Sequence, residues 1–295
     1  MNAVDILLPY YGEEELMRQS VLSIKAQHRT DWRLIVLDDA YPHAQPQAWF
    51  NSLCDPRIYY ERNTENLGAN RNFQKALNLA QAPVVVMMGA DDIMLPTYLD
   101  EVLGLLASHP EATVIQPGVR VIDGEGLPVS SLADTVKSLV RPSSDRPVTL
   151  AGEQMAASLL HAGWHYFPSL AWRLEKIRKF GFRPEYDVVQ DLALLMDIAA
   201  SGGSMVVASK NVVFSYRRHA ASDSSVRAVD GRRFDEERRF FREQADRFAG
   251  MGWHRASRAA RLHWTSRLHA VSLLLRSLPR PTIARTRVLG RHALT

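Results

Sequence analysis

Two adjacent carboxylates follow a short apolar run in the first third of the chain. Asp91 and Asp92 come after Val84–Met88, which is apolar at every position and is therefore typical of a central strand buried on both faces. Carboxylate oxygens at the end of such a strand are hard ligands that suit Mg²⁺ or Mn²⁺ together with substrate phosphates. The simpler alternative is that one of them caps the helix that begins near Pro96.

A second acidic pair, Asp38 and Asp39, ends the strand expected at Trp32–Leu37. A carboxylate there can accept hydrogen bonds from the N–H of a nucleotide base or from a ribose hydroxyl. Turn formation before Pro42 is the alternative role for this pair.

An amide-rich segment from Asn66 to Asn72 opens a predicted helix and contains one cation, Arg71. Backbone N–H groups at a helix start favour anions, so this segment suits the phosphates or polar edges of a nucleotide. Capping of the helix by Asn66 or Asn70 is the alternative role.

Two further groups of residues stand later in the chain. Asp191 precedes an apolar helical run, where an acid is either compensation for the helix dipole or a general base beside an acceptor hydroxyl. Arg217, Arg218 and His219 end a late strand, where two cations and an imidazole can bind a diphosphate or complete a metal shell. A basic strand end in contact with solvent is the alternative for this trio.

The pattern of elements explains why these residues would meet. Strand-length apolar runs alternate with helix-period segments through residue 116, which predicts βαβ units and a mostly parallel sheet. Ligands bind beyond the carboxyl ends of such strands, and Pro9, Tyr10 and Tyr11 also stand at one of these ends.

The second part of the chain has a weaker pattern. We expect residues 118–150 to be mostly loop, 169–180 to be helical, and two short strands at 205–208 and 211–216. A helical pattern then runs from Arg232 to Leu278, with an interruption at 250–252.

Composition and charge limit the classes of protein. The chain has 295 residues, 46% of them hydrophobic, and one cysteine, which excludes a disulfide framework. It contains no apolar stretch long enough to span a membrane, and its first residues do not resemble a signal peptide, so we expect a cytoplasmic protein. The segment from Arg247 to Thr295 contains ten arginines and no acid, whereas residues 1–246 together carry −6.

The order and spacing of these motifs resemble the family 2 glycosyltransferases over about residues 3–225. The resemblance implies a GT-A fold: an α/β domain with a Rossmann-like, mostly parallel central sheet flanked by helices. Residues 1–116 would then be the nucleotide-binding half and 117–230 the acceptor half of a domain spanning 1–230. Residues 231–295 would form a basic helical C-terminal extension.

The resemblance also implies roles for single residues. The residues expected to contact the base and ribose are Pro9, Tyr10, Tyr11, Asp38 and Asp39. Asn66 and Arg71 are expected to make further contacts with the nucleotide. Asp91 matches the metal-binding carboxylate and Asp191 the general base. His219 resembles a residue that meets the metal or the diphosphate, with Arg217 and Arg218 as phosphate partners.

The chain departs from the family pattern at two of these positions. Gly89 stands where the first residue of the family's Asp-x-Asp motif is expected, so Asp92 either replaces that ligand or contacts the substrate. Gln190 precedes the expected base, where the family often has Glu.

The function implied is inverting transfer of a sugar from a nucleoside-diphosphate-sugar to a hydroxyl of a glycan, polymer or lipid-linked acceptor, with Mg²⁺ or Mn²⁺ and no nucleic acid as partner. Such an enzyme fits polysaccharide biosynthesis at the cell envelope. A catalytically inactive glycan- or nucleotide-binding module is one alternative. A sugar nucleotidyltransferase is another, although its Gly- and Arg-rich loop is absent after the first strand.

The basic extension also leaves two roles open. Arg255, Arg258, Arg261 and Arg267 stand beside an apolar stripe that includes Trp253 and is typical of an amphipathic helix. Such a helix binds an anionic membrane at its inner face, as a peripheral contact. Alternatively, the stripe packs on the catalytic domain or on a second subunit in a homo-oligomer.

Overall fold

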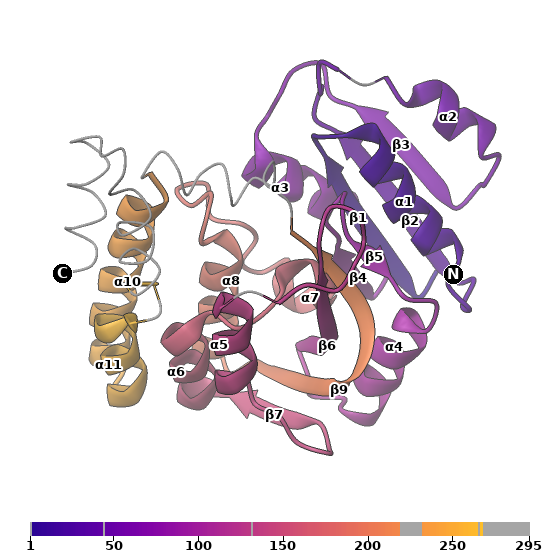
Figure 1. Cartoon of the computed structure of the whole chain (residues 1–295). Coiled ribbons are helices and arrows are strands. Elements are labelled where there is room, and N and C mark those ends of the chain that lie inside the picture. The colour runs from indigo at the N-terminus through magenta and orange to yellow at the C-terminus, as the bar shows by residue number, and fades with distance from the viewer. Residues whose placement is uncertain (1, 44, 131, 219–231, 265, 268–295) are drawn as a thin grey trace.

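The computed structural model describes residues 2–43, 45–130, 132–218, 232–264 and 266–267, and Figure 1 shows a central sheet between helices. The strands are β1 (Val4–Tyr10), β2 (Trp32–Asp38), β3 (Ile58–Arg62), β4 (Val84–Met87), β5 (Ile93–Met94), β6 (Val114–Ile122), β7 (Val148–Ala151), β8 (Ala171–Arg173) and β9 (Ser204–Arg217). The helices are α1 (Glu14–Lys25), α2 (Gln47–Ser52), α3 (Ala69–Leu79), α4 (Tyr98–Ser108), α5 (Leu132–Val140), α6 (Gly152–Ala162), α7 (Leu174–Ile177), α8 (Gln190–Ala200), α10 (Arg232–Gly250) and α11 (His254–Leu262), with a 3₁₀ turn η1 (Phe167–Ser169).

The first half of the sheet is parallel, as the alternation of strands and helices predicts. The strand order is β3-β2-β1-β4-β8-β6-β9-β5, with β7 added on β9. Strands β3, β2, β1 and β4 pair in parallel, so their carboxyl ends share one edge. The loops that carry the predicted nucleotide-binding residues therefore leave the sheet on the same side.

Both faces of the sheet are covered by apolar packing. Alternate residues of β1 point to opposite sides: Ile6 and Leu8 join one core with residues of α1 and α4, and Leu7 joins another with residues of α3, α6 and α8. The continuous apolar sequence of the central strands follows from this double burial.

The second half of the sheet differs from the expectation at residues 169–180. Only Leu174–Ile177 is helical, and Ala171–Arg173 forms β8, which pairs antiparallel with both β4 and β6. The prediction was wrong because this segment lies between two strands that offer backbone partners on either side, and Trp172 is completely buried there. Tertiary contacts outweigh a weak helical pattern in so short a segment.

The expectation of a loop at residues 118–150 was also wrong. Strand β6 continues to Ile122, and the segment contains α5 and β7 as well. The two short strands expected after residue 204 form one strand, β9, whose parallel register with β6 shifts on either side of Gly118. A Cβ at Gly118 would lie 2.2 Å from the Asn211 carbonyl oxygen, so the two backbones can cross only where no side chain is present.

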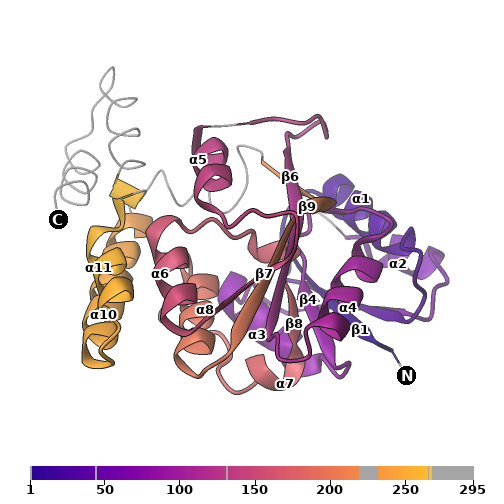
Figure 2. The same ribbon diagram turned by 90° about the horizontal axis from the view of Figure 1, so that it is seen from below.

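The helical extension packs against the rest of the molecule. Helices α10 and α11 are separated by Gly252 with a φ of 74°, and they lie side by side beyond α6 and α8 in both views (Figures 1 and 2). Ala256 and Ala260 are buried in the same core as α6 and α8, and Trp253 stacks on Phe248. The part of the apolar stripe that the structure describes is therefore covered by protein, which fits the packing alternative.

Arg255, Arg258 and Arg261 remain exposed on α11. The apolar stripe of the sequence continues at Leu268, Val271 and Leu275, and these three positions lie outside the described residues. In the part of the chain that the structure describes, no helix combines the length and apolar character needed to cross a membrane.

Candidate active site

Asp39 ties the end of β2 to the segment that opens α3. Its Oδ1 accepts hydrogen bonds from Asn63 Nδ2 and from the Leu67 backbone N–H, both at 2.8 Å, and its Oδ2 accepts one from the Gly68 N–H at 2.9 Å. The side chain is almost completely buried. Asp39 therefore shapes the predicted nucleotide pocket, and Oδ2 keeps capacity to accept a further hydrogen bond.

Asp38 is also buried, with partners on the neighbouring strand β3. Its Oδ2 accepts hydrogen bonds from Tyr60 Oη at 2.7 Å and from Arg62 Nη1 at 2.6 Å, and its Oδ1 accepts a longer one from the Tyr41 N–H. This carboxylate holds β2, β3 and the following loop together. Contact with a ribose would have to compete with these partners.

Aromatic rings gather where β1 and β2 end. Pro9 and Tyr10 close β1, and Tyr10 is buried with its hydroxyl donating to the Gly12 carbonyl oxygen. Tyr11 is 53% exposed and packs edge to face with Tyr41, with 5.0 Å between ring centroids. An exposed ring beside a buried one offers a surface on which a base or sugar can stack. Tyr41 was missed by the sequence reasoning, although it directly follows the acidic pair and Ala40.

The amides before α3 act mainly within the protein. Asn66 Oδ1 accepts a hydrogen bond from the Gly68 N–H at 2.8 Å, so it forms a local turn and does not cap the helix. Arg71 is exposed and makes no hydrogen bond with the described residues, which leaves its cation available to a ligand. Asn70 is buried, and its Nδ2 donates to the backbone oxygens of Arg183 and Tyr186.

Asp91 and Asp92 converge over Gly89 at the end of β4. A Cβ at Gly89 would lie 2.5 Å from Asp92 Oδ2 and 2.9 Å from Asp91 Oδ1, so these oxygens occupy the space of a side chain at position 89. Asp92 Oδ1 accepts the Arg217 N–H at 2.8 Å, whereas Oδ2 is buried without a hydrogen-bond partner in the described part of the chain. Burial raises the pKa of Asp92 well above its ordinary value, and the charge of Asp91 raises it further.

These two carboxylates fit a divalent cation. A buried carboxylate oxygen that lacks a donor and lies beside a second carboxylate is the arrangement that a bound cation satisfies. The described residues contain no group of three acidic, His or Cys side chains that could hold a metal. His219, the other predicted metal ligand, lies outside the described residues.

Arg217 has a different role from the one expected. Its side chain is buried, and its guanidinium donates to the backbone oxygens of Asp91, Asp123 and Gly124 and to Gln19 Oε1. These protein acceptors take four of its five N–H donors, so Arg217 organises the acidic pair from behind, and a diphosphate would have to compete with them. Arg218 is partly exposed, and its Nη2 donates to Asp134 Oδ1 at 2.6 Å.

Asp191 lies at the start of α8, with its side chain 23% exposed and its Oδ2 3.0 Å from His165 Nε2. Its Oδ1 accepts the Leu192 N–H at 2.7 Å. Burial acts to raise the pKa of Asp191, but the charge and hydrogen bond of His165, the Leu192 N–H and the charge of Lys137 outweigh burial and lower it. Asp191 is therefore held as a carboxylate that solvent or a ligand can still reach.

Helix α5 connects the two acidic regions. Asp134 accepts hydrogen bonds from Arg218 and, at 3.2 Å, from Tyr166 Oη. Lys137, one turn later, lies over the Tyr166 ring, with its ammonium nitrogen 4.8 Å from the ring centroid. Because Arg218 follows the residue that binds Asp92, this cluster joins the end of β4 to the surroundings of Asp191. None of the α5 residues was singled out from sequence, since the segment was expected to be loop.

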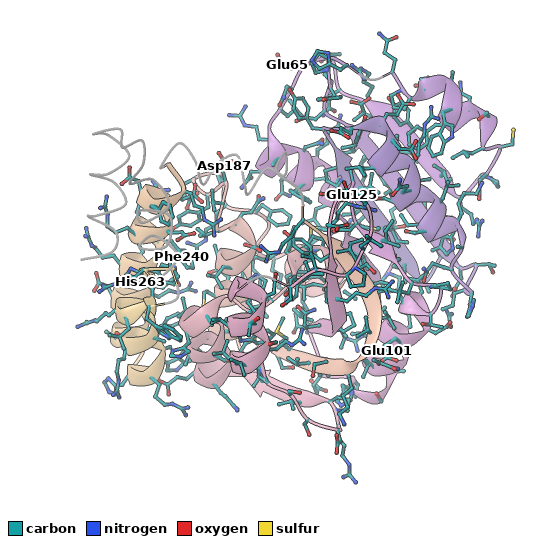
Figure 3. All side chains as sticks on the ribbon, in the orientation of Figure 1. Glu65, Glu101, Glu125, Asp187, Phe240 and His263 are labelled. Carbon is teal, nitrogen blue, oxygen red and sulfur yellow. The ribbon has the colours of Figure 1, made fainter. Side chains whose placement is uncertain are left out.

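The segment before Asp191 is held by α10. The backbone N–H groups of Asp187, Val188 and Val189 donate to the Glu236 carboxylate, at 2.6 to 3.1 Å. Figure 3 shows Asp187 close to the beginning of α10. Asp197, further along α8, accepts hydrogen bonds from Arg183 and Arg247 and is buried, so it is unsuited to meet a substrate.

Comparison with known proteins identifies the family. Residues 5–151 match the model of glycosyl transferase family 2. This segment belongs to that family. An uncharacterized glycosyltransferase of Methanocaldococcus jannaschii is 26% identical over 126 residues, which are 42% of this chain and 43% of the relative. The chain spans less than half the length of the curated relatives that it matches.

Solved structures share the fold over nearly the whole chain. Residues 1–349 of S. aureus TarS in complex with UDP-GlcNAc align with a TM-score of 0.69 at 14% identity, covering 99% of this chain and 80% of that 1–349 segment. The mannosyltransferase PcManGT of Pyrobaculum calidifontis, in complex with GDP-Man and Mn²⁺, aligns with a TM-score of 0.61 at 17% identity, covering 99% and 79%. The fold is the GT-A fold.

Relative to the matched segment, the predicted site residues fall into two groups. The acidic and aromatic residues at the ends of β1, β2 and β4 lie in the matched segment, whereas Asp191, Arg217 and Arg218 lie after it. The second group reaches the first through contacts that the structure describes, chiefly Arg217 with Asp92.

Proposed function

We propose that this chain transfers a sugar from a nucleoside-diphosphate-sugar to a hydroxyl of a glycan, polymer or lipid-linked acceptor, with inversion at the anomeric carbon. The observation that carries the proposal is a pair of converging carboxylates at the end of β4, connected through Arg217, Arg218 and α5 to a partly exposed carboxylate, Asp191. Membership of residues 5–151 in glycosyl transferase family 2 supports the reaction class.

The donor class is supported by the neighbours in fold and by the strand ends. TarS and PcManGT bind UDP-GlcNAc and GDP-Man, respectively. In this chain, the exposed Tyr11 ring can stack on the base, Asp39 Oδ2 can accept a hydrogen bond, and the exposed Arg71 can contact a phosphate. These groups suit the nucleotide part of such a donor.

Asp91 and Asp92 would hold Mg²⁺ or Mn²⁺, which supplies positive charge to the departing diphosphate. Behind them, Arg217 fixes the Asp92 carboxylate through its backbone N–H and fixes the Asp91 backbone through its Nε. Arg218, the residue after Arg217, is partly exposed and paired with Asp134, and it would provide a cation of the protein itself.

Asp191 would act as the general base. It accepts the proton of the acceptor hydroxyl while the hydroxyl oxygen forms a bond to the anomeric carbon and the bond to the diphosphate breaks. A single displacement of this kind inverts the configuration and requires one base and no protein nucleophile. The His165 hydrogen bond and the nearby Lys137 favour the carboxylate form that this step requires.

The experiment is a donor screen followed by a test of the base. UDP-, GDP- and dTDP-sugars are added with Mn²⁺, and ligands that bind the folded chain raise its unfolding temperature. Release of nucleoside diphosphate and product stereochemistry are then measured with the donor found, with and without EDTA.

Asp191→Asn should bind the donor nearly as the unchanged chain does, but its turnover should fall by roughly 10²- to 10⁴-fold. Near-normal turnover would place the base elsewhere. Donor binding without any turnover of the unchanged chain would instead favour a binding module, and retention of configuration would reject the single displacement.

A further inference from the structure

Among the described residues, the His165 side chain has one hydrogen-bond partner, which is Asp191. The ring lies in the segment between α6 and η1, and its Nε2 is 3.0 Å from Asp191 Oδ2. Because an ionised carboxylate can only accept, the imidazole Nε2–H donates this hydrogen bond. We infer that His165 is a positioning residue for Asp191, which it holds in one orientation and in the charged form; this inference rests on the proposed function.

The burial of His165 supports a role at Asp191. Its side chain is 6% exposed, and Nδ1 has no hydrogen-bond partner among the described residues. A buried polar ring with one nitrogen unpaired costs free energy, which a purely structural position would avoid with an apolar side chain. The hydrogen bond to the proposed base is therefore the interaction that offsets the cost of burying this ring.

The Asp191 carboxylate is held at both oxygens and is still partly exposed. Asp191 Oδ2 faces His165, and Oδ1 accepts the Leu192 N–H, so both oxygens are fixed while the side chain is still 23% exposed. A base held at both oxygens loses little conformational entropy when an acceptor arrives, which is how a surrounding shell preorganises a catalytic group.

Other charged groups also face Asp191. Lys137 of α5 and Arg233 of α10 contribute positive charge at this carboxylate, together with His165. Arg233 is paired with Glu237 on its own helix at 2.7 Å, so much of its charge is balanced there. His165 is the group among these three that hydrogen-bonds to Asp191 directly.

The test uses the full chain with the donor and acceptor found by the screen. His165→Phe removes the donor group, and His165→Asn keeps a polar side chain that is too short to reach Asp191. His165→Gln restores an N–H at nearly the position of Nε2 without the charge. His263→Gln is the matched control, since His263 is also buried but lies at the end of α11 (Figure 3), where its ring stacks on Phe241.

His165→Phe and His165→Asn should lower kcat by at least about 10-fold, the lower range typical of a residue that orients a functional group. Donor Kd, measured by calorimetry, should change less than about 2-fold. The acid limb of the pH profile of kcat/KM should move to higher pH, because Asp191 then stays buried without its main partner and its pKa rises. His165→Gln should recover most of kcat, and His263→Gln should leave kcat and the acid limb unchanged.

Three outcomes would overturn the inference in different ways. A normal kcat and an unmoved acid limb in His165→Asn, with Asp191→Asn inactive, would reject the role of His165 alone. Near-normal turnover of Asp191→Asn would reject the base and this inference with it. A fall in donor affinity that matches the fall in kcat, without recovery in His165→Gln, would mean that His165 supports the fold only.

Discussion

Lys137 is enclosed among charges of both signs, and its titration should be visible in the stability of the protein. Burial first, and then the nearby charge of Arg218, lower the pKa of Lys137 to about 8 against the opposing effect of Asp134 and Asp191. In the unfolded chain a lysine has a pKa of about 10.4. Between these values the unfolded chain binds more protons than the folded one, so this group makes the free energy of unfolding rise with pH from about 8 to 10.4.

We therefore expect Lys137→Met to raise the free energy of unfolding most at low pH. At pH 7 the substitution removes a charge that is costly to bury, whereas at pH 10 the folded chain already holds a neutral amine. The difference in free energy of unfolding between Lys137→Met and the unchanged chain should decrease from pH 7 to pH 10, as measured by urea denaturation. Lys179→Met, at an exposed position, is the control. If the difference in free energy of unfolding were constant with pH, Lys137 would be hydrated and its pKa would be the same in the folded and unfolded chain.

At the scale of elements, α10 holds the start of α8. Glu236 accepts hydrogen bonds from three consecutive backbone N–H groups just before Asp191, and α8 has no side-chain cap of its own. Glu236→Ala should leave these N–H groups without an acceptor, at a cost of about 1–3 kcal/mol in the free energy of unfolding. Turnover should fall more than donor affinity, because the displaced segment carries the proposed base.

Asp235→Ala is the matched control for Glu236→Ala. Asp235 is the preceding residue on α10, and it is exposed in an ion pair with Arg238. An exposed pair of this kind contributes little, so stability and turnover should stay close to those of the unchanged chain. Equal effects of the two substitutions on stability and turnover would show that the Glu236 hydrogen bonds do not hold the start of α8.

The contacts of α10 with the start of α8 could not be predicted from the sequence, whereas several strands could. The parallel strands β1, β2 and β4 were predicted because their apolar runs and turn residues are local signals, and the acidic pairs were located at their ends for the same reason. Glu236, His165 and Lys137 could not be found in this way, since their contacts with the α8 region join residues 26 to 54 positions apart in sequence. The short β8 was missed because its neighbours, not its own residues, make it a strand.

At the scale of the whole molecule, the helical extension and the GT-A domain share one core. Phe240 and Phe248 of α10 are completely buried in the cluster that also contains Leu7 and Met87 of the sheet. Phe240→Ala should therefore lower the free energy of unfolding by about 3–5 kcal/mol, the usual cost of removing a buried aromatic ring. The chain should still unfold in one cooperative transition, seen alike by circular dichroism and by loss of donor binding.

Arg242→Ala provides the comparison for Phe240→Ala. It lies two residues further along α10 and is exposed, so the change should be within about 0.5 kcal/mol. Two separate transitions, with Phe240→Ala shifting only the first, would contradict the shared core. Residues 231–295 would then behave as a separate domain.

The crowding around Gly89 has a consequence for protein engineering. Consensus design replaces unusual residues by those most frequent in a family, and it commonly adds stability. Here it would introduce Asp at position 89, where a Cβ would lie 2.5 Å from Asp92 Oδ2. An Asp side chain at position 89 would therefore compete for space with the Asp91 and Asp92 carboxylates, and these would have to move. A substitution chosen only from the frequency of residues in a family would thus disturb the acidic pair of this chain.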